Sequence, residues 1–264
     1  GYTREASETI VGANVAVLQS LISKSLIWHD KNRRYQMHHL LHQFAEHQLA
    51  SAGDIETTKQ AHCIYFGEKL SDLRSQLRSR GQLSALNTIE QDIENIRAGW
   101  FYAINQEALE LIENYLKSLF YFYSMRSRIN EGIELFNFAI TSLTQTTLTR
   151  DKKLLLARIL GRQGSLVHRL SHYEQAKQLL DAALNVFQQT ESMDEVAFVL
   201  NNLADIARAS GDYQVAKQLC EDSLTIFQEL EDDWSIAGTL NNLAVVSYLL
   251  GDLIDAEKYC KRSL

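Results

Sequence analysis

Two stretches that lie forty residues apart decide the expected fold: residues 197–216 read AFVLNNLADIARASGDYQVA, and residues 237–256 read AGTLNNLAVVSYLLGDLIDA. The same pattern begins once more at Ala157, forty residues before Ala197, and we call each of the three occurrences a register. The positions that agree in all three registers are Leu160, Leu200 and Leu240; Gly164, Ala204 and Ala244; Ala176, Ala216 and Ala256; and Leu184, Leu224 and Leu264. Self-similarity at a fixed period of this length is typical of stacked repeats, so the last third of the chain is predicted to be a repeat array.

Each forty-residue unit is predicted to be a pair of helices joined by a tight turn. Small residues recur where the two helices must approach closely, and a turn dipeptide separates the two apolar patterns. The turn dipeptides are Ser171-His172, Gly211-Asp212 and Gly251-Asp252. A single hairpin cannot bury its apolar face alone, so successive hairpins are expected to stack into a superhelix.

Both quoted stretches resemble the tetratricopeptide repeat. The residues that carry the resemblance are Leu203-Ala204, Gly211-Asp212-Tyr213, Ala216 and Ser223-Leu224, then Leu243-Ala244, Gly251-Asp252-Leu253 and Ala256. Two features depart from that motif: its usual period is about 34 residues, and the proline that often closes its second helix is missing here. Residues 224–230 are expected to extend the second helix, as in longer variants of the repeat.

The composition favours an all-helical protein. The 264 residues are 45% hydrophobic and include no proline, so a large core can form and little interrupts the helices. The net charge of -7 argues against a chain that binds nucleic acid over its whole surface. No apolar run reaches the roughly 18–20 residues that span a bilayer, and no signal peptide opens the chain. Cytoplasmic localisation is therefore expected, with Cys63, Cys220 and Cys260 as reduced core residues.

The amino-terminal part follows a different pattern from the repeats. Thr3 is expected to cap a short helix that Gly12 ends, and a second helix is expected over residues 14–24. Residues 26–28 and 34–37 then read as two strands of a hairpin with its turn at residues 30–32. A third helix follows from His38, and its apolar residues at core spacing are Leu40, Leu41, Phe44, Ala45 and Leu49. This order of elements is the outline of a winged helix that lacks its first helix.

Three segments of this part resemble the winged-helix region of bacterial STAND-class regulatory NTPases: residues 2–6, 18–26 and 34–41. The resemblance continues through residues 90–98 and 130–133, which are similar to the linker and the first repeat of these regulators. It implies that the chain is a C-terminal fragment in which a winged-helix arm precedes sensor repeats. It also implies that ATP or ADP binds in a domain upstream of Gly1, and no cofactor is expected within the fragment.

The expected organisation has three parts. A partial winged-helix domain covers residues 1–52, a helical linker with a break near Gly81 covers residues 53–106, and a repeat array covers residues 107–264. The array opens with a degenerate repeat, in which Gly132 precedes Ala176 by 44 residues instead of 40, and continues with units from residues 157, 197 and 237. The predicted fold is mainly α: a partial winged helix with a small β-hairpin, followed by an α-α superhelix of tetratricopeptide-like repeats.

No catalytic or metal site is predicted for this fragment. It contains no phosphate loop of the Gly-x-x-x-x-Gly-Lys kind, and no recognisable arrangement of a nucleophile with a base. His38 and His42 stand one helical turn apart and could share an ion, but no carboxylate or cysteine is placed to complete a site. His168 and His172 have the same spacing, which a solvated helix end explains equally well. The fragment is therefore predicted not to be an enzyme.

The hairpin tip is the candidate for contact with DNA. Lys31, Arg33 and Arg34 could contact phosphate groups if the winged helix bound a duplex. Residues 1–50, however, carry five basic and four acidic side chains, which is a poor basis for binding driven by counterion release. Direct DNA contact is therefore not expected. By the resemblance, this module works inside the regulator and holds the nucleotide domain closed.

The repeats supply the candidate binding surface. In tetratricopeptide repeats the first helix of each pair lines a concave groove, and by that resemblance two asparagine pairs lie at or beside groove positions. Asparagine donates and accepts hydrogen bonds, so it could hold the backbone of an extended peptide. The candidate partner-binding residues are Asn201, Asn202, Asp205, Arg208, Asn241, Asn242, Val245 and Tyr248. The alternative role is structural, because asparagine pairs can also bridge neighbouring hairpins.

Two functions are consistent with the sequence. The first is the sensor region of a cytoplasmic STAND-type signal-transduction ATPase or transcription regulator, which binds an inducer or a protein partner through its repeats and whose parent oligomerises. The second is a free-standing scaffold that binds a protein or peptide without a nucleotide switch. The sequence leaves open whether the ligand is a protein, a peptide or a small molecule, and no membrane contact is expected.

Overall fold

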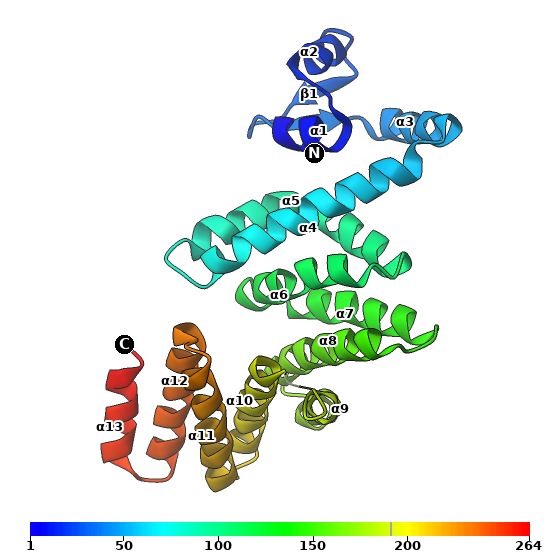
Figure 1. The fold of residues 1–264 in the computed structure, drawn as a ribbon. Coiled ribbons are helices and arrows are strands. Elements are labelled where there is room, and N and C mark those ends of the chain that lie inside the picture. Colours follow the sequence, from blue (N-terminus) through cyan, green and yellow to red (C-terminus); the bar gives the residue numbers. More distant parts are fainter. Residues whose placement is uncertain (191) are drawn as a thin grey trace. The chain divides into compact units, whose positions relative to one another are not determined.

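The computed structural model describes residues 1–190 and 192–264, and the chain forms two compact units, Gly1–Phe122 and Tyr123–Leu264. The predicted fold class is confirmed, because helical repeats follow a small antiparallel hairpin (Figure 1). In chain order the elements are α1 (Arg4–Val11), α2 (Val15–Ser23), β1 (Ile27–His29), β2 (Tyr35–Met37), α3 (His39–Ala52), α4 (Ile55–Leu77), α5 (Gln82–Asn105), α6 (Leu109–Met125), α7 (Ile129–Thr144), α8 (Arg150–Arg169), α9 (Tyr173–Phe187), α10 (Met193–Ala209), α11 (Tyr213–Glu229), α12 (Asp233–Leu249) and α13 (Leu253–Arg262).

The first elements of the chain begin and end close to the predicted residues. Thr3 Oγ1 and Asn14 Oδ1 each accept a hydrogen bond at 3.1 Å from the backbone N–H three residues further on. These bonds satisfy N–H groups of the first helical turn that have no partner within the helix. Gly12 ends α1 with a φ of 66°, a left-handed conformation that glycine adopts without strain. β1 and β2 pair with Ile27 opposite Met37, so the hairpin is confirmed, and each strand begins one residue later than predicted.

The third helix forms where it was predicted, but its predicted core role is wrong. His38 caps α3, whose side chains Leu40 and Phe44 are 67% and 62% exposed, and no residue of α3 is buried. Leu41 and Leu49 are only partly covered. An apolar spacing shows which side chains share a helix face, but burial also needs a second element to cover that face. Among the described elements, α3 packs mainly on α4, and its apolar face stays exposed.

A close helix approach forms the core of the first unit. Tyr115 on α6 is buried against α4 and α5, and its hydroxyl donates a hydrogen bond of 2.6 Å to the carbonyl oxygen of Cys63. The Cys63 thiol in turn donates to the carbonyl oxygen of Gly99 on α5 at 3.3 Å. A Cβ atom at Gly99 would lie 2.1 Å from the Tyr115 hydroxyl oxygen, so only glycine fits. Burial raises the pKa of Tyr115, which therefore stays a neutral donor.

A buried carboxylate connects the amino-terminal hairpin to the α4–α5 pair. Asp92 on α5 is 3% exposed; one of its oxygens accepts a hydrogen bond from the Arg34 guanidinium, and the other lies 2.8 Å from the Lys69 ammonium on α4. Arg34 also donates to the carbonyl oxygen of Gly1 at 2.7 Å, and Asn95 donates to the same oxygen at 2.9 Å. Arg34, considered above for phosphate contact, is therefore buried and bound within the protein. Lys31 and Arg33 alone of the three remain exposed.

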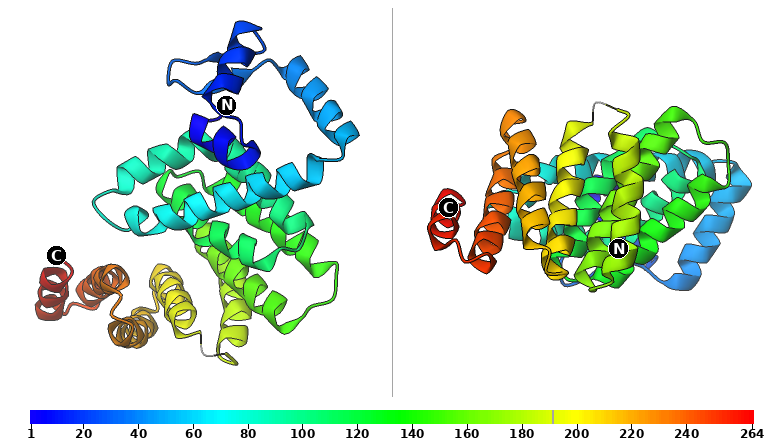
Figure 2. Two further views of the ribbon diagram at one scale, coloured as in Figure 1. Left: turned by 45° about the horizontal axis from the view of Figure 1, so that its top comes forward. Right: turned by 90° about the horizontal axis from the view of Figure 1, so that it is seen from below.

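The second unit contains the predicted hairpins. α8 pairs with α9, α10 with α11, and α12 with α13, and the later helices lie side by side (Figures 1 and 2). The three turn dipeptides separate the helices as predicted. The first residue of each dipeptide has a positive φ: 87° at Gly211, 85° at Gly251 and 63° at Ser171. The turn geometry is thus the same in each hairpin, although Ser171 lacks the conformational freedom of glycine.

The small residue predicted between the helices is required by close packing. A Cβ atom at Gly164 on α8 would lie 2.9 Å from Leu180 Cγ and 3.2 Å from the carbonyl oxygen of Ala176, both on α9. In the degenerate first repeat, a Cβ atom at Gly132 would lie 2.7 Å from a Leu166 methyl group. The positions of closest approach therefore match the repeat register read from the sequence.

The cysteines show that a following helix is needed for burial. Cys220 on α11 is fully buried, in a cluster with Leu240 and Leu243 of α12, and burial raises the pKa of its thiol to about 12. Cys260 occupies the equivalent position on α13, forty residues later, but it is exposed. The reason is that α12 covers α11, whereas no described helix covers α13 in the same way. The prediction of a core residue is confirmed for Cys63 and Cys220 and is wrong for Cys260.

Two glycine substitutions are expected to change stability in opposite directions. Gly211→Ala places a side chain on a left-handed residue and should lower the free energy of unfolding by about 1–2 kcal/mol. Gly238→Ala lies inside α12, where no heavy atom stands within 4 Å of the new Cβ, and should raise it by about 0.5–1 kcal/mol. Urea titrations followed by circular dichroism would measure both, and two shifts of the same sign would contradict the turn assignment.

Removing the buried charge of Asp92 should destabilise the first unit. Asp92→Asn preserves the shape of the side chain but leaves Arg34 and Lys69 beside a neutral amide, so a loss of about 3–5 kcal/mol is expected. Glu8→Gln is the matched control, since it breaks the exposed pair with Arg4 and should cost less than about 1 kcal/mol. Equal effects of the two substitutions in urea titrations would show that the Asp92 contacts contribute little.

Candidate functional site

The predicted partner-binding residues lie on α10 and α12, the first helices of two consecutive hairpins. Residues three, four and seven positions apart share one face of a helix, which places Asn201, Asp205 and Arg208 together on α10. The same spacing places Asn241, Val245 and Tyr248 together on α12. The two sets are one period of forty residues apart in the sequence.

Side-chain hydrogen bonds join the two helices at this face. The Asn242 amide donates to Asn201 Oδ1 at 3.3 Å and to Asp205 Oδ2 at 3.4 Å, so α12 is connected to α10. On α10, Arg208 forms an ion pair with Asp205 at 3.1 Å. The structure thus brings four of the eight predicted residues into one hydrogen-bonded group. Asn242 takes the bridging role that the alternative interpretation of the asparagine pairs requires.

Asn202 is placed differently from the other seven residues. It is buried, and its amide donates to the carbonyl oxygen of Phe198, one turn earlier on the same helix, at 2.7 Å. This bond stays within α10, so Asn202 neither reaches the neighbouring hairpin nor faces solvent. Neighbouring residues of an α-helix point about 100° apart, so Asn202 faces the packed side of α10 although Asn201 does not.

The remaining three residues are exposed and form the open part of the surface. Tyr248 is 65% exposed and Val245 is 40% exposed, although both are large and apolar. Asn241 is also exposed, and no hydrogen bond of its side chain occurs in the described part of the chain. We name the group of Asn201, Asp205, Arg208, Asn241, Asn242, Val245 and Tyr248 the asparagine face. It combines amide donors and acceptors with an uncovered aromatic ring.

One residue beside the asparagine face was not predicted as part of it. His168 on α8 occupies the slot that Arg208 and Tyr248 occupy in the next two units. Burial lowers the pKa of His168, and the Arg208 and Arg169 charges lower it further, while the Asp205 charge opposes them. His168 is therefore mainly neutral at pH 7. The forty-residue register places His168 at the position equivalent to Arg208, but the candidate residues were taken only from the two later repeats.

A buried ion pair connects the first two full repeats and was also missed. Arg162 on α8 and Glu195 on α10 are 5% and 1% exposed, and their charged groups lie 2.7 Å apart. The Arg162 guanidinium also lies 3.8 Å from the centre of the Phe198 ring, a favourable contact of a cation with an aromatic face. Arg158 lies 3.9 Å from the same carboxylate. The group is enclosed between the repeats, so we assign it to their packing.

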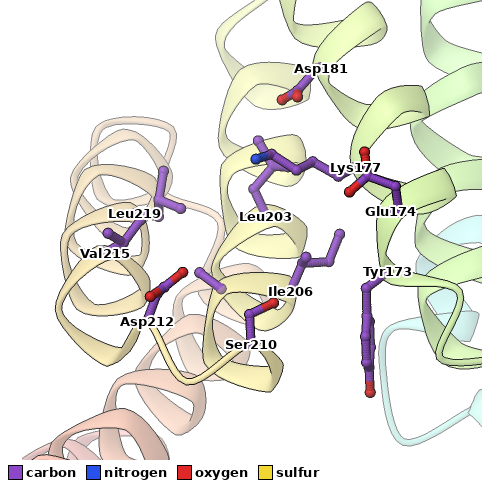
Figure 3. A pocket seen from close by; sticks show the side chains of 11 residues that line it. Tyr173, Glu174, Lys177, Asp181, Leu203, Ile206, Ser210, Asp212, Val215 and Leu219 are labelled. Carbon is purple, nitrogen blue, oxygen red and sulfur yellow. The ribbon is translucent and has the colours of Figure 1, made fainter.

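A cavity of about 250 Å³ lies on another side of α10. Its lining comes from α9, α10 and α11 together with the residues before α11 (Figure 3): Tyr173, Glu174, Lys177, Asp181, Leu203, Ile206, Ala207, Ser210, Asp212, Val215 and Leu219. We name it the α9–α11 cavity. The α10 residues that line it stand roughly half a helical turn away from the asparagine face. Periodicity within one repeat could not predict it, because three helices of two repeats must pack before it forms.

The described residues contain neither a metal cluster nor a membrane-spanning helix. No group of three or more histidine, cysteine, aspartate or glutamate side chains within them is arranged to hold a metal ion. The histidine pairs weighed above accordingly lack further ligands in that part of the chain. None of the helices in these residues has both the length and the apolarity that crossing a membrane requires.

Comparison with known families found two matches in the second unit. Residues 155–229 match a tetratricopeptide repeat model. A second tetratricopeptide repeat model matches residues 236–264. Both matches lie within the second unit and include every residue of the asparagine face. Tetratricopeptide repeats generally bind protein partners and do not generally carry catalytic sites.

Comparison with solved structures supports the fold. The crystal structure of BtubC (BKLC) from P. vanneervenii resembles this chain with a TM-score of 0.50 and 18% sequence identity. The similarity covers 78% of this chain and 89% of that one. At this identity it shows a shared arrangement of helices and nothing about the ligand. The search among curated proteins found no significant relative.

The two members of the second asparagine pair should differ when replaced. Asn242→Ala removes the hydrogen bonds to α10, so it should lower the free energy of unfolding by about 1 kcal/mol. Asn241→Ala removes an exposed side chain and should leave stability unchanged within about 0.5 kcal/mol. Thermal and urea unfolding of the two variants would test this difference. Equal stability of the two would mean that the bridge between α10 and α12 contributes nothing.

Proposed function

We propose that this chain is a protein-interaction region that binds a segment of a partner protein at the asparagine face. The observation that carries the proposal is the uncovered group of Asn241, Val245 and Tyr248 beside the hydrogen-bonded group of Asn201, Asp205 and Asn242. Val245 and Tyr248 are large side chains that stay 40% and 65% exposed there. Tyrosine at such positions often supplies a large share of binding energy.

The chemistry of this face suits an extended peptide. Each residue of an extended backbone presents one N–H donor and one carbonyl acceptor, and the side-chain amide of Asn241 offers both complements. Tyr248 and Val245 can bury an apolar side chain of the partner, because both lose water-accessible surface on contact. Asn242 positions Asn201 and Asp205 and thereby limits the conformational freedom that binding would otherwise cost.

We further propose that the interaction region belongs to a cytoplasmic STAND-type regulator, as the sequence resemblance implies. Two of the segments that carry the resemblance meet in the first unit, where Arg34, the residue before β2, binds Asp92 of α5. In this proposal, the buried ion pair fixes the winged-helix arm to the helices that follow it. In this proposal, ATP or ADP binds in an upstream domain, and an inducer or partner at the repeats releases autoinhibition.

The scaffold alternative predicts the same asparagine face but no response to nucleotide. The intact parent protein separates the two, and light scattering with and without ATP would measure its oligomeric state. Assembly that requires both ATP and a repeat-binding ligand supports the regulator. An unchanged mass under every nucleotide condition, or an upstream reading frame without a phosphate-binding loop, supports the scaffold.

Removing the exposed groups of the asparagine face should weaken partner binding without loss of stability. Peptides selected by display against the wild-type chain would be titrated calorimetrically against the Asn241→Ala, Tyr248→Ala double variant. A rise in Kd of at least tenfold is expected, equivalent to about 1.4 kcal/mol. The matched control replaces Gln218 and Thr225, two exposed polar residues of α11, by alanine. Unchanged affinity of the first variant, or equal losses in both, would place the binding site elsewhere.

A further inference from the structure

The α9–α11 cavity has an apolar floor. Leu203 and Ile206 of α10 form its base and are almost fully buried, while Leu219 and Val215 of α11 form one wall. Val215 is 54% exposed, so the apolar surface continues from the base to the outer edge of this wall. The volume of about 250 Å³ exceeds that of one aliphatic side chain, and a single leucine or isoleucine could enter.

Three carboxylates surround this floor. Glu174 and Asp181 stand on α9, and Asp212 precedes α11 on the opposite side (Figure 3). The cavity also contains one basic group, the Lys177 ammonium, whose side chain extends from α9 towards Leu203. Three negative groups against one positive group leave the rim acidic.

The charges of the rim are not neutralised by neighbours. In the part of the chain that the structure describes, Glu174, Asp181 and Asp212 form no ion pair, and neither does Lys177. Two other acidic groups of the second unit do form ion pairs: Glu195 pairs with Arg162, and Asp255 pairs with Lys217. The rim therefore carries a net negative charge beside an apolar surface.

Asp212 differs from its counterpart in the next repeat. Asp252 occupies the same slot, and its carboxylate caps α13 by accepting a hydrogen bond of 3.0 Å from the backbone N–H of Asp255. The Asp212 side chain makes no such capping bond to α11. It points instead into the space between α11 and α10 (Figure 3). Its carboxylate is thus available to a group that enters the cavity.

We propose that the α9–α11 cavity is a second docking site, which binds a basic segment of a partner protein with an aliphatic side chain flanked by lysine or arginine. Charge complementarity selects this occupant. The aliphatic side chain lies on Leu203 and Ile206, and the flanking basic groups pair with Asp212 on one side and with Asp181 and Glu174 on the other. In an extended segment, neighbouring side chains alternate in direction, so one apolar group points inward while basic groups remain at the rim.

This site is separate from the asparagine face. Leu203, Ile206 and Ser210 line the cavity from one side of α10, while Asn201 and Asp205 face another side of the same helix. A partner could occupy the cavity whether or not the asparagine face is occupied. The inference does not rest on the function proposed above, and the two can be tested separately.

Synthetic peptides test the proposal directly. The probe is a blocked peptide in which lysine and leucine alternate, and its binding to the intact chain would be measured by fluorescence anisotropy. Two further peptides, with glutamate in place of lysine or serine in place of leucine, test the charge and the apolar anchor. The lysine–leucine peptide should bind at least tenfold more tightly than either. Added salt should weaken it, because rim charges are partly screened at about 8–10 Å in physiological buffers.

Matched variants assign the binding to the cavity. The triple variant Glu174→Gln, Asp181→Asn, Asp212→Asn should weaken the lysine–leucine peptide at least tenfold. The control triple Asp222→Asn, Glu229→Gln, Glu231→Gln changes the net charge equally at exposed positions and should change Kd less than twofold. The Asn241→Ala, Tyr248→Ala variant should bind this peptide normally, which separates failure here from failure of the asparagine face.

The opposite outcomes would overturn the proposal. Equal losses in the two triple variants would show attraction by net charge alone. Equal affinity for the serine-containing peptide would show that the apolar floor is not used. The reversal Asp181→Lys, Asp212→Lys gives a positive test that does not depend on loss of binding. It should shift the preference towards the glutamate–leucine peptide, and an unchanged preference contradicts docking in this cavity.

Discussion

The second unit depends on one constraint, which is that a helical hairpin cannot bury its own apolar face. Each second helix is covered only when the first helix of the next hairpin lies on it. Cys220 and Cys260 show the effect at identical positions, since α12 buries the first and no described helix buries the second. The forty-residue period follows from this constraint, because every unit must present the same apolar and small residues to its neighbour. The surfaces that remain free to bind partners are those that stacking leaves open.

Polar contacts add order to this packing without replacing it. Between the first two full repeats, Arg162 and Glu195 form a buried pair, and between the next two, Asn242 bonds to Asn201 and Asp205. Arg162, Asn202 and Asn242 are forty residues apart and occupy equivalent positions in three successive repeats. Their roles differ: Arg162 carries a buried charge, Asn202 bonds within its own helix, and Asn242 bridges two helices. Burying an ion pair costs desolvation energy and adds little net stability. A shift of one helix along the other would leave both charges buried without a partner, which would cost free energy.

Sequence patterns predicted the elements well and the environments of single residues less well. Turn chemistry and spacing placed the hairpin turns, the Thr3 cap and the close contact at Gly164, because each depends on residues near in sequence or on a strict period. The exposure of Leu40 and Phe44 could not be read in this way, since a helical period says nothing about whether another element covers the face. Arg34 appeared to be a solvated hairpin residue because its partner, Asp92, is 58 residues away. The candidate surface was partly predictable. The repeat period located the helices α10 and α12, but only the structure shows that the Asn202 side chain is buried.

The exposed apolar face of α3 also indicates which part of the first unit should unfold most easily. A helix with no buried side chain has little to lose on unfolding, so its backbone amides should exchange with solvent well before those of α4 or α5. Proteases act on such transiently open segments, and α3 joins the amino-terminal hairpin to the helical pair. A single cut there would break the covalent connection, but Arg34 and Asp92 would still bind the two pieces to each other. The first unit is therefore expected to remain assembled after a single cut in α3.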